Sequence, residues 1–388
     1  MKEVKKFLEQ ELLTNICPFW EKMVDMENGG FYGATDENYE ILKTAPKGVV
    51  YISRILFSYS FLYLKYKDEK YLKLAQTAYR FMIDKLNDQE NGGFYWSTSY
   101  DGEVLNDNKH LYGNSFALYG LSAYYIASND LRAIGYASQI LKIIENAMID
   151  FPNNYFEEYS RDFKPLPNRI MEGFNMVPEI TTNTLLHLAE ALSLYYSCLK
   201  NPLAKELTIK ILNILFEKGY DHENKNLYQF LNYKLENQIE VYSYGHNLEV
   251  SWLFMDVMKL CGYKNEEYTK NCIEMFERNY ELSFNGKYII NETVNGVTDN
   301  SAIWWVQAEA LVALNNVYNI TNCVNYKNGM KAITQFIKKH FVNENKEWHW
   351  GINEDMSIQT NHSISEMWKA NYHNVRAILK VLEDNDGE

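Results

Sequence analysis

The sequence predicts an all-α fold, an (α/α)6 barrel of twelve helices with short β-hairpins on one face. Three observations support this prediction. A polar turn motif recurs six times along the chain, at intervals of 60 to 71 residues. Two stretches of helical hydrophobic periodicity lie between successive motifs. The 388 residues accommodate six such units, and six helical pairs are enough to close a ring.

The turn motif is most distinct near the N-terminus, where the segment Glu27–Tyr32 (ENGGFY) recurs unchanged as Glu90–Tyr95. Looser versions follow, and the six units are marked by Asn28, Asn91, Asn153, Asn224, Asn285 and Asn345. In each unit a polar turn precedes alternating aromatic and polar residues, a pattern typical of a short β-hairpin. We therefore expect a hairpin between each helical pair and the next.

The helical stretches between the turns are of two kinds. Asp68–Leu86 carries its apolar side chains along one stripe, which predicts an amphipathic outer helix. Val177–Leu199 and Ser301–Asn319 are apolar around more of their circumference, which predicts inner helices packed on both sides. Proline and glycine do not cluster into a linker, so residues 1–388 are expected to form a single barrel domain. An open helical solenoid of the same repeat is the alternative.

Composition and charge exclude several classes of protein. Apolar residues make up 46% of the chain, with only 7 prolines and 19 glycines, which excludes a disordered or collagen-like protein. The net charge of −13 argues against nucleic acid as a partner, because phosphate binding requires basic patches. The five cysteines form no CxxC pair, and the first residues contain no apolar signal-peptide core, so a cytoplasmic protein is expected. The uncharged stretch His110–Asn129 contains small and polar residues, which indicates a buried helix rather than a membrane span.

Unusual polar and aromatic residues fall on every second helix, the inner set whose ends converge on one mouth of a closed barrel. In chain order they are Arg54, His110, Tyr112, Asn183, His187, His246, Glu249, Trp304, Trp305, Glu309, Trp368, Tyr372 and His373. Ligand pockets typically hold a few polar groups among aromatic walls. The pattern therefore predicts a small-molecule site at this mouth.

Helical spacing decides which of these residues can cooperate. Three pairs are three or four positions apart and share a helix face: His246 with Glu249, Asn183 with His187, and Trp305 with Glu309. An imidazole beside a carboxylate can have its tautomer fixed and its pKa held near neutrality, as a proton-transfer catalyst requires. Three histidines and an arginine grouped with carboxylates favour proton abstraction beside a carbonyl.

Other chemistries fit the residues less well. The glycine pairs at residues 29–30 and 92–93 fall in hairpin turns, whereas a phosphate loop lies between a strand and a helix. The sequence contains no HExxH or comparable cluster, and Arg54 would oppose a cation, so no metal is expected. Glu249 and Glu309 could act as the paired carboxylates of a glycosidase, and this alternative remains open. A sugar-binding protein without catalytic activity is a further alternative.

The chain resembles the cellobiose 2-epimerases of the N-acylglucosamine 2-epimerase superfamily along nearly its whole length. The segments that carry the resemblance are Pro18–Trp20, Glu27–Gly33, Ser53–Leu56, Lys109–Tyr112, Thr182–Asn183 with His187, Ser243–Glu249, Trp304–Glu309, Trp368–Lys369 and Tyr372–Asn374. One departure is that Ala370 and Asn371 stand where these enzymes usually have Cys-Pro. This departure bears on the preferred substrate rather than on the proton chemistry.

The resemblance implies a cofactor-independent isomerase that epimerises C2 of the reducing-end sugar of a β-1,4-linked disaccharide, such as cellobiose, lactose or mannobiose. It implies that His246 and His373 exchange the C2 proton from opposite faces of the opened sugar. Arg54, His187 and Glu249 would bind or polarise that sugar. A monosaccharide 2-epimerase or an aldose–ketose isomerase of the same superfamily is the main alternative.

The resemblance also implies how the sugar is held. Trp305 and Trp368 would line its subsites, because aromatic faces stack on the apolar faces of sugar rings. Tyr112, Asn183, Trp304 and Glu309 are expected to bind substrate with them. No partner besides the sugar is expected, and the protein would be a monomer or a homodimer.

Overall fold

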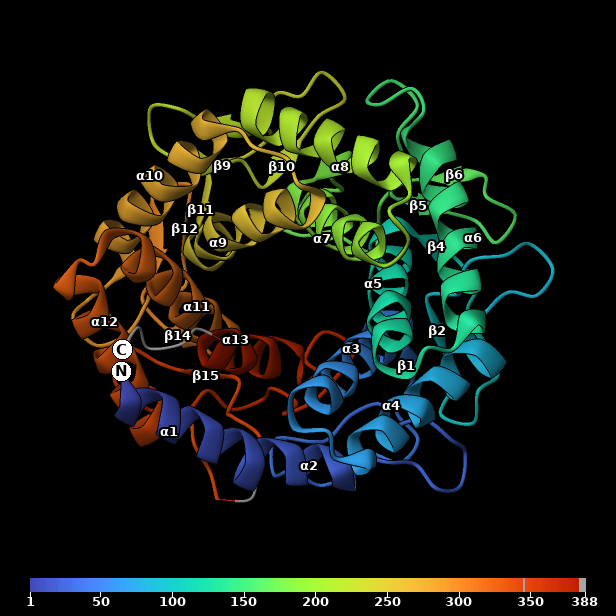
Figure 1. Cartoon of the computed structure of the whole chain (residues 1–388), viewed down its shortest axis with the longest axis horizontal. Coiled ribbons are helices and arrows are strands. Elements are labelled where there is room, and N and C mark those ends of the chain that lie inside the picture. Colours follow the sequence, from blue (N-terminus) through green and yellow to red (C-terminus); the bar gives the residue numbers. More distant parts are fainter. Residues whose placement is uncertain (345, 384–388) are drawn as a thin grey trace.

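The computed structural model describes residues 1–344 and 346–383, and within them the helices form two concentric rings (Figure 1). The inner ring consists of α3 (Val49–Tyr66), α5 (Leu111–Ser128), α7 (Thr182–Leu199), α9 (Tyr244–Cys261), α11 (Trp304–Thr321) and α13 (Tyr372–Glu383). Each inner helix packs against the next, and α13 packs against α3, so the ring is closed. The predicted (α/α)6 barrel is confirmed, and the open solenoid is wrong.

The outer ring covers the inner one. It consists of α4 (Glu69–Phe81), α6 (Leu131–Met148), α8 (Pro202–Ile214), α10 (Glu266–Ser283), α12 (Val324–His340) and the continuous N-terminal run α1 (Lys2–Glu11), η1 (Leu12–Ile16) and α2 (Cys17–Lys22). The π-helical segments η2 (Met82–Leu86) and η3 (Leu215–Gly219) extend α4 and α8. The Asp68 carboxylate accepts a hydrogen bond from the backbone N–H of Lys70 at 3.0 Å and caps α4. The outer helix predicted over Asp68–Leu86 is therefore confirmed at both ends.

Burial separates the two rings as the hydrophobic patterns predict. Residues Val49–Ser60, the first three turns of α3, are all buried, because this helix packs against neighbours on every side. In α4 the buried residues are confined to one stripe. The predicted inner helix Val177–Leu199 begins five residues later than expected, since residues 180–181 form a strand and Thr181 caps α7.

Short antiparallel strands connect the helical pairs on one face. Their order and pairing are β1 (Lys47–Gly48) with β2 (Ser97–Thr98) and β3 (Val104–Asn106); β4 (Lys109–His110) with β5 (Glu158–Tyr159) and β6 (Pro165–Leu166); β7 (Ile180–Thr181) with β10 (Phe230–Leu231); β8 (Tyr220–Asp221) with β9 (Asn226–Leu227); β11 (Val241–Ser243) with β12 (Glu292–Val294) and β13 (Val297–Asp299); and β14 (Ala302–Ile303) with β15 (Gly351–Ile352). The strands β1, β4, β7, β11 and β14 each run directly into an inner helix. Because each of these strands pairs with the hairpin of the following unit, the strands hold the N-termini of those inner helices at the same face of the barrel.

The recurring turns are held by one repeated set of contacts. Asp25 Oδ1 accepts hydrogen bonds from the backbone N–H groups of Glu27 and Asn28 at 3.0 and 2.9 Å. Asp88 binds Glu90 and Asn91 in the same way, and Asp221 binds Glu223 and Asn224. Gly29, Gly30, Gly92 and Gly93 have φ between +68° and +80°, the left-handed region that glycine adopts without strain. The turns predicted at Asn28, Asn91, Asn224 and Asn285 each connect bridged residues. The hairpin predicted at Asn153 is wrong, because among the described residues no bridge closes the turn at 151–154, and Asn345 lies outside the described residues.

A buried lysine ties each of the first two turns to an inner helix. Lys109 Nζ lies 2.9 Å from Asp88 Oδ2 and 2.9 Å from the Gly92 carbonyl, with both charged side chains buried. We expect Asp88→Ala to lower the free energy of unfolding by about 3–5 kcal/mol, because it leaves a buried ammonium without its partner. Urea denaturation measures this loss. Glu90→Ala is the matched control, since Glu90 makes an exposed ion pair with Arg161, and an equal loss in both variants would contradict the prediction.

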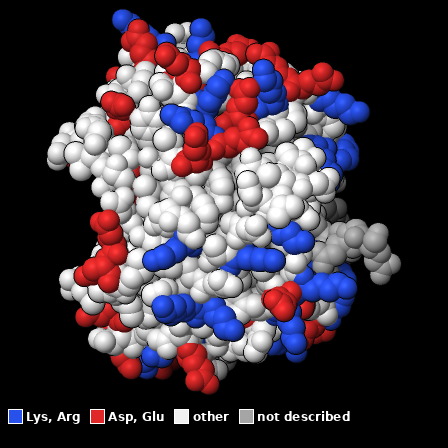
Figure 2. Space-filling model, turned by 90° about the vertical axis from the view of Figure 1, so that its left-hand side faces the viewer, with Lys and Arg blue, Asp and Glu red and all other residues white. Residues whose placement is uncertain are grey.

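The surface over α10, α12 and α1 carries charges of both signs (Figure 2). Acidic side chains gather near the upper edge of this face together with basic ones, and further basic side chains lie across its lower half. The net charge of −13 is therefore not spread as one continuous acidic field on this face. Among the described helices, none is both long enough and apolar enough to cross a bilayer.

Candidate active site

The structure brings the predicted site residues together at the hairpin end of the inner ring. Six inner helices and the segment before α13 supply Arg54, Tyr112, Asn183, His187, His246, Glu249, Trp304, Trp305, Glu309, Trp368 and His373. All are buried except Asn183, His246, Trp305 and Trp368, which are partly exposed. The side chains with partial exposure are those a ligand entering from this end would meet first.

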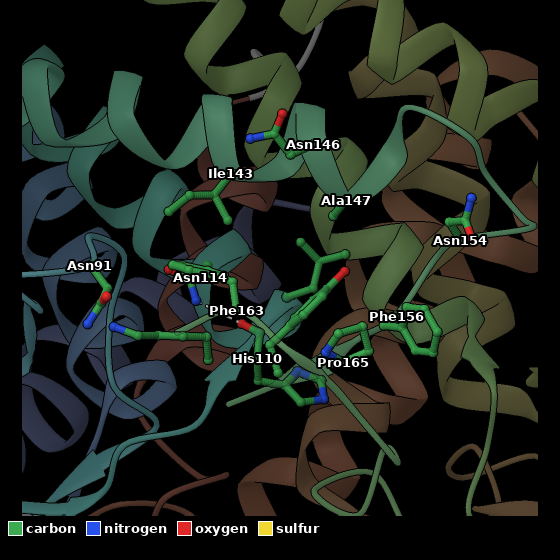
Figure 3. Close-up of a pocket in the computed structure, with 13 residues that line it drawn as sticks. Asn91, His110, Asn114, Ile143, Asn146, Ala147, Asn154, Phe156, Phe163 and Pro165 are labelled. Atoms are coloured by element: carbon green, nitrogen blue, oxygen red, sulfur yellow. Dashed lines mark hydrogen bonds between the residues drawn. The ribbon is translucent and has the colours of Figure 1, made fainter. Parts of the chain in front are cut away.

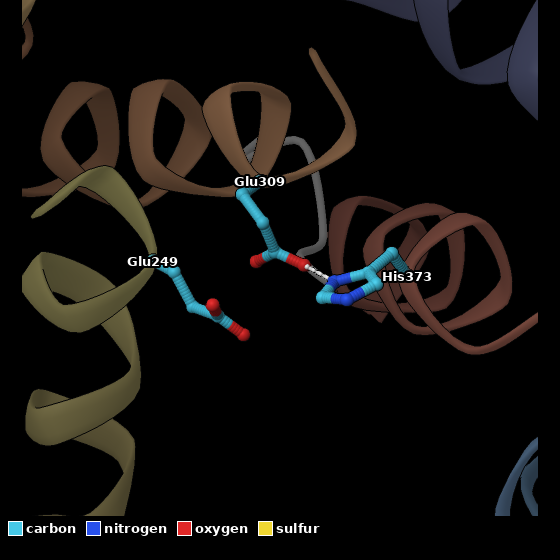
Figure 4. Close-up of side chains that lie close together, drawn as sticks. All are labelled: Glu249, Glu309 and His373. Atoms are coloured by element: carbon cyan, nitrogen blue, oxygen red, sulfur yellow. Dashed lines mark hydrogen bonds and ion pairs between the residues drawn. The ribbon is translucent and has the colours of Figure 1, made fainter. Parts of the chain in front are cut away.

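His373 is bound to a carboxylate of the neighbouring inner helix. Its Nδ1 atom lies 2.6 Å from Glu309 Oε1, and both side chains are buried (Figure 4). The second oxygen of Glu309 accepts a hydrogen bond from the Trp252 indole at 3.1 Å. The rings of Trp304 and Trp305 lie 5.4 and 5.6 Å from the imidazole. Burial lowers the pKa of His373 well below its ordinary value, so the imidazole is neutral near pH 7.

A second imidazole–carboxylate pair lies within α7. His187 Nδ1 is 3.0 Å from Glu190 Oε2, three positions along the helix. Glu190 also accepts hydrogen bonds from the Tyr372 hydroxyl at 2.8 and 2.9 Å. The His187 ring lies 4.7 Å from Phe116 and 5.5 Å from Tyr112. This side chain is therefore fixed by polar contacts on one edge and by aromatic rings around it.

His246 differs from the other two histidines. Its Nδ1 atom lies 2.8 Å from Ser243 Oγ, and its ring packs 4.8 Å from Trp305. The predicted pairing of His246 with Glu249 does not form a hydrogen bond, because Ser243 binds the imidazole and Arg376 binds the carboxylate. Burial lowers the pKa of His246 to about 4, although the nearby Glu249 opposes this shift.

Arg54 presents a positive charge to the same mouth. Its Nη2 group donates a hydrogen bond to the Tyr112 hydroxyl at 2.9 Å, and its Nη1 group donates to the backbone carbonyl of Trp368. The guanidinium lies over the Phe116 ring, 4.5 Å from its centroid. These contacts connect α3 and α5 to the segment before α13 and fix the direction of the guanidinium.

Two residues that the sequence analysis missed organise the cluster. Arg376 on α13 binds Glu190, Glu249 and Glu309, and Glu190 binds His187. Each lies three positions after a predicted histidine, Glu190 after His187 and Arg376 after His373. The spacing rule that paired His246 with Glu249 would therefore also have selected these two residues.

Glu249, Glu309 and His373 point toward one another from α9, α11 and α13 (Figure 4), and their ligand atoms lie within 4.8 Å of one another. A group of this kind can hold a metal ion. Here, however, Arg376 Nη2 binds both carboxylates, at 2.8 Å in the case of Glu309. The positive charge beside these two carboxylates is therefore that of the guanidinium.

His110 belongs to the scaffold of the mouth. Its Nδ1 atom accepts a hydrogen bond from the backbone N–H of Tyr112 at 3.1 Å and caps α5, and its Nε2 atom lies 2.9 Å from Asn168 Oδ1. Burial lowers the pKa of His110 to about 4. This residue therefore caps the N-terminus of α5 and holds the backbone of Tyr112 in place.

The His110 cap predicts a pH-dependent stability. The pKa of His110 is lower in the folded than in the unfolded state. The stability that the neutral imidazole contributes is therefore complete above pH 6.5 and is lost as the pH falls to 4. We expect wild type to lose roughly 3 kcal/mol relative to His110→Asn over this range, since asparagine caps the helix without titrating. Urea denaturation at several pH values measures the difference, and parallel curves would contradict the prediction.

A separate cavity of about 500 Å³ lies away from this cluster, between α5, α6 and the segment 154–165 (Figure 3). Phe156, Phe163 and the side chains of Ile143 and Asn146 line it, and His110 reaches its edge. None of the eleven residues that form the cluster contributes to its walls. The cavity is thus distinct from the candidate active site.

Comparison with known proteins places the chain in a class. The sequence profile of the N-acylglucosamine 2-epimerase (GlcNAc 2-epimerase) family matches residues 30–377. The protein therefore belongs to this family, and the resemblance noted in its motifs is confirmed. The predicted class, an isomerase that epimerises a carbohydrate, is confirmed with it.

The individual relatives are more specific. The cellobiose 2-epimerase of Dictyoglomus turgidum is 33% identical over 387 residues, covering 99% of each chain. That of Eubacterium cellulosolvens is 33% identical, covering 96% of this chain and 97% of its own. The solved cellobiose 2-epimerase of Bacillus thermoamylovorans B4167 has a TM-score of 0.95 at 33% identity, covering 99% of this chain and 100% of its own. A solved D-mannose isomerase, with a TM-score of 0.84 at 18% identity and 99% and 97% coverage, shares the fold.

Proposed function

We propose that the protein converts cellobiose to its C2 epimer at the reducing end, using His246 and His373 to exchange the C2 proton. The observation that carries this proposal is that both imidazoles pack on Trp305, with ring centroids 4.8 and 5.6 Å away. They come from different inner helices, α9 and α13. Inversion by proton removal and return requires two proton-transfer groups on opposite sides of C2, one unprotonated imidazole that accepts the proton and one protonated imidazole that gives one. The cellobiose 2-epimerases among its relatives support the same substrate.

The chemistry begins with opening of the sugar ring. Opening converts C1 to a carbonyl, and only a proton next to a carbonyl is acidic enough for an imidazole to remove. One histidine then takes the C2 proton, the electron pair moves to the carbonyl oxygen, and an enediolate forms. The other histidine, present at this point as the imidazolium, delivers its proton to the opposite face of C2 and becomes neutral, and closure of the ring gives the epimer. Proton exchange with solvent then restores the starting protonation states of the two imidazoles. Related β-1,4 disaccharides such as lactose and mannobiose present the same reducing end.

Arg54 is the proposed stabiliser of the enediolate. A guanidinium fixed beside the developing oxygen charge contributes more in a buried site than in water, because it is already oriented when the charge forms. The hydrogen bonds to Tyr112 and to the Trp368 carbonyl provide that orientation. His187 and Glu249 complete the polar wall that binds the opened sugar.

Several buried polar atoms are suited to sugar hydroxyls. Within the described residues, Arg54 Nε, Asn183 Oδ1, Glu249 Oε2 and Trp304 Nε1 are buried without a hydrogen-bond partner. Such atoms are uncommon in folded proteins and mark positions where a ligand can supply the missing bonds. Trp305 and Trp368 are partly exposed and can stack on the sugar rings. We propose that these residues, with Tyr112 and Glu309, form the substrate site.

The glycosidase alternative fits the geometry less well. Two hydrolytic carboxylates must flank one glycosidic bond. Glu249 and Glu309 instead bind the same nitrogen of Arg376, so both carboxylates are held by one guanidinium. An aldose–ketose isomerase needs the same proton abstraction and differs in whether the proton returns to C1 or C2.

We further propose a cytoplasmic location, in keeping with the five free cysteines of the described chain.

Incubation of cellobiose with the protein in D2O, followed by NMR, tests the proposal. The expected result is a disaccharide with a mannose reducing end and deuterium at C2. Formation of a ketose would show that the protein is an aldose–ketose isomerase. Release of free glucose would show that it hydrolyses the disaccharide. Absence of both deuterium incorporation and product would contradict an enzymatic function on this sugar.

A further inference from the structure

One buried cation, Arg376, binds the carboxylates that contact His187 and His373, and it joins four inner helices. Arg376 on α13 is 3% exposed. Its Nη1 group lies 2.6 Å from Glu190 Oε1 on α7, and its Nη2 group lies 2.8 Å from Glu309 Oε1 on α11 and also binds Glu249 on α9. The guanidinium is enclosed by the rings of Tyr372 and Trp252, 4.3 and 4.9 Å from their centroids. A single side chain therefore binds three buried carboxylates, which share its one positive charge.

Two of these carboxylates are the partners of histidines. Glu309 binds Nδ1 of His373, and Glu190 binds Nδ1 of His187. An ionised carboxylate can only accept a hydrogen bond, so the Nδ1 atom it binds must carry the proton. The Nε2 atom of that neutral imidazole then has a free lone pair. A protonated carboxyl would instead donate to Nδ1, and the proton would move to Nε2.

Burial opposes the ionised form of both carboxylates. Burial is the largest influence on the pKa of Glu309 and leaves that pKa raised, while the charge and hydrogen bond of Arg376 act to lower it. Burial also acts to raise the pKa of Glu190, but Arg376, His187 and Tyr372 together hold that pKa far below its ordinary value. Arg376 is thus the main cation that keeps these groups charged, and a guanidinium does not itself lose its proton.

We propose that Arg376 is a positioning residue that keeps Glu309 and Glu190 ionised and thereby fixes His373 and His187 in the tautomer with an unprotonated Nε2 atom. The role assigned to His373 as a base rests on the proposed function, whereas the tautomer does not. The titratable and charged groups that act on His373 from the surrounding helices are Glu309, Glu249, His187, Arg54 and Arg376. Since a guanidinium does not lose its proton, Glu309, which binds Nδ1 directly, is the group through which pH reaches this imidazole.

Arg376→Met tests the proposal, with wild type and Lys380→Met as references. Methionine removes the charge and retains much of the side-chain length. Lys380 lies one turn further along α13 and pairs with Asp256, so its loss removes a cation of the same helix without touching the histidines. Two properties are measured in all three proteins: the tautomer of His373, from imidazole ¹⁵N NMR without substrate, and the pH profile of deuterium exchange at C2 of cellobiose.

In Arg376→Met we expect the His373 proton to move from Nδ1 to Nε2 near pH 7. We also expect the acid limb of the exchange rate to move to higher pH, because a less stabilised Glu309 carboxylate takes up its proton earlier. Wild type and Lys380→Met should agree in both measurements. An unchanged tautomer, together with a rate lowered equally at every pH, would overturn the proposal and leave Arg376 a purely structural role.

Arg376→Lys covers the case in which the methionine variant does not fold. Its ammonium keeps the charge but cannot reach carboxylates on three helices at once, so His373 or His187 should lose the wild-type tautomer. Retention of both wild-type tautomers in a folded Arg376→Lys protein would overturn the proposal. If wild type exchanges no C2 proton, the proposed function fails, and the NMR tautomer alone decides the role of Arg376.

Discussion

Replacing His246 or His373 by alanine is expected to lower the rate of cellobiose epimerisation by roughly 10²–10⁴-fold, the usual contribution of a positioned acid or base. The loss should appear in kcat, because the role proposed for each imidazole is proton transfer. Product formation measured by chromatography gives the rate, and circular dichroism shows whether each variant is folded.

His222→Ala is the matched control for these variants. The His222 imidazole lies 3.1 Å from the Phe216 carbonyl at the outer ring and contacts none of the site residues. Its removal should leave the rate at the wild-type value. A wild-type rate in either His246→Ala or His373→Ala would contradict the assignment of that histidine.

Arg54→Met is expected to reduce kcat by roughly 10²–10³-fold, the effect of removing one oriented donor from a developing oxyanion. Tyr112→Phe should have a smaller effect in the same direction, because it removes only the hydroxyl that orients the guanidinium at 2.9 Å. Steady-state kinetics on cellobiose separates kcat from KM.

The control for Arg54 is Arg132→Met. Arg132 lies at the start of the outer helix α6 and pairs with Asp130 on the surface. This variant should retain both kinetic constants. A rise in KM at constant kcat in Arg54→Met would show that Arg54 binds the substrate without stabilising the enediolate, and would contradict the role proposed for it.

Much of the fold could be predicted from the sequence because its signals are local. The Asp-x-Glu-Asn-Gly-Gly turns depend on hydrogen bonds within four residues, such as those that the backbone N–H groups of Glu90 and Asn91 donate to Asp88. Outer and inner helices differ in how much of their circumference is apolar, which is also visible in sequence. The pairing of each strand with the next unit, for example β1 with β2, joins residues about 50 positions apart and left no local pattern.

The residues of the candidate site could be selected individually from the sequence, but helical spacing does not settle which of the possible partners each one binds. His246 has Ser243 three positions before it and Glu249 three positions after it, and helical spacing alone does not decide between them. The choice follows from Arg376, which arrives from α13 and binds Glu249. That contact depends on which helices face one another across the closed ring, a property of the tertiary structure.

The most direct test of the central claim, that two imidazoles serve opposite faces of C2, is an exchange measurement on the two single variants. His246→Ala and His373→Ala are each incubated in D2O with cellobiose and, separately, with its C2 epimer, and loss of the C2 proton is followed by ¹H NMR. We predict that each variant exchanges the C2 proton much faster than it interconverts the sugars, that one variant exchanges the C2 proton of cellobiose alone, and that the other exchanges that of the epimer alone. Exchange of the same sugar by both variants, or epimerisation by either at the wild-type rate, would contradict the two-base account.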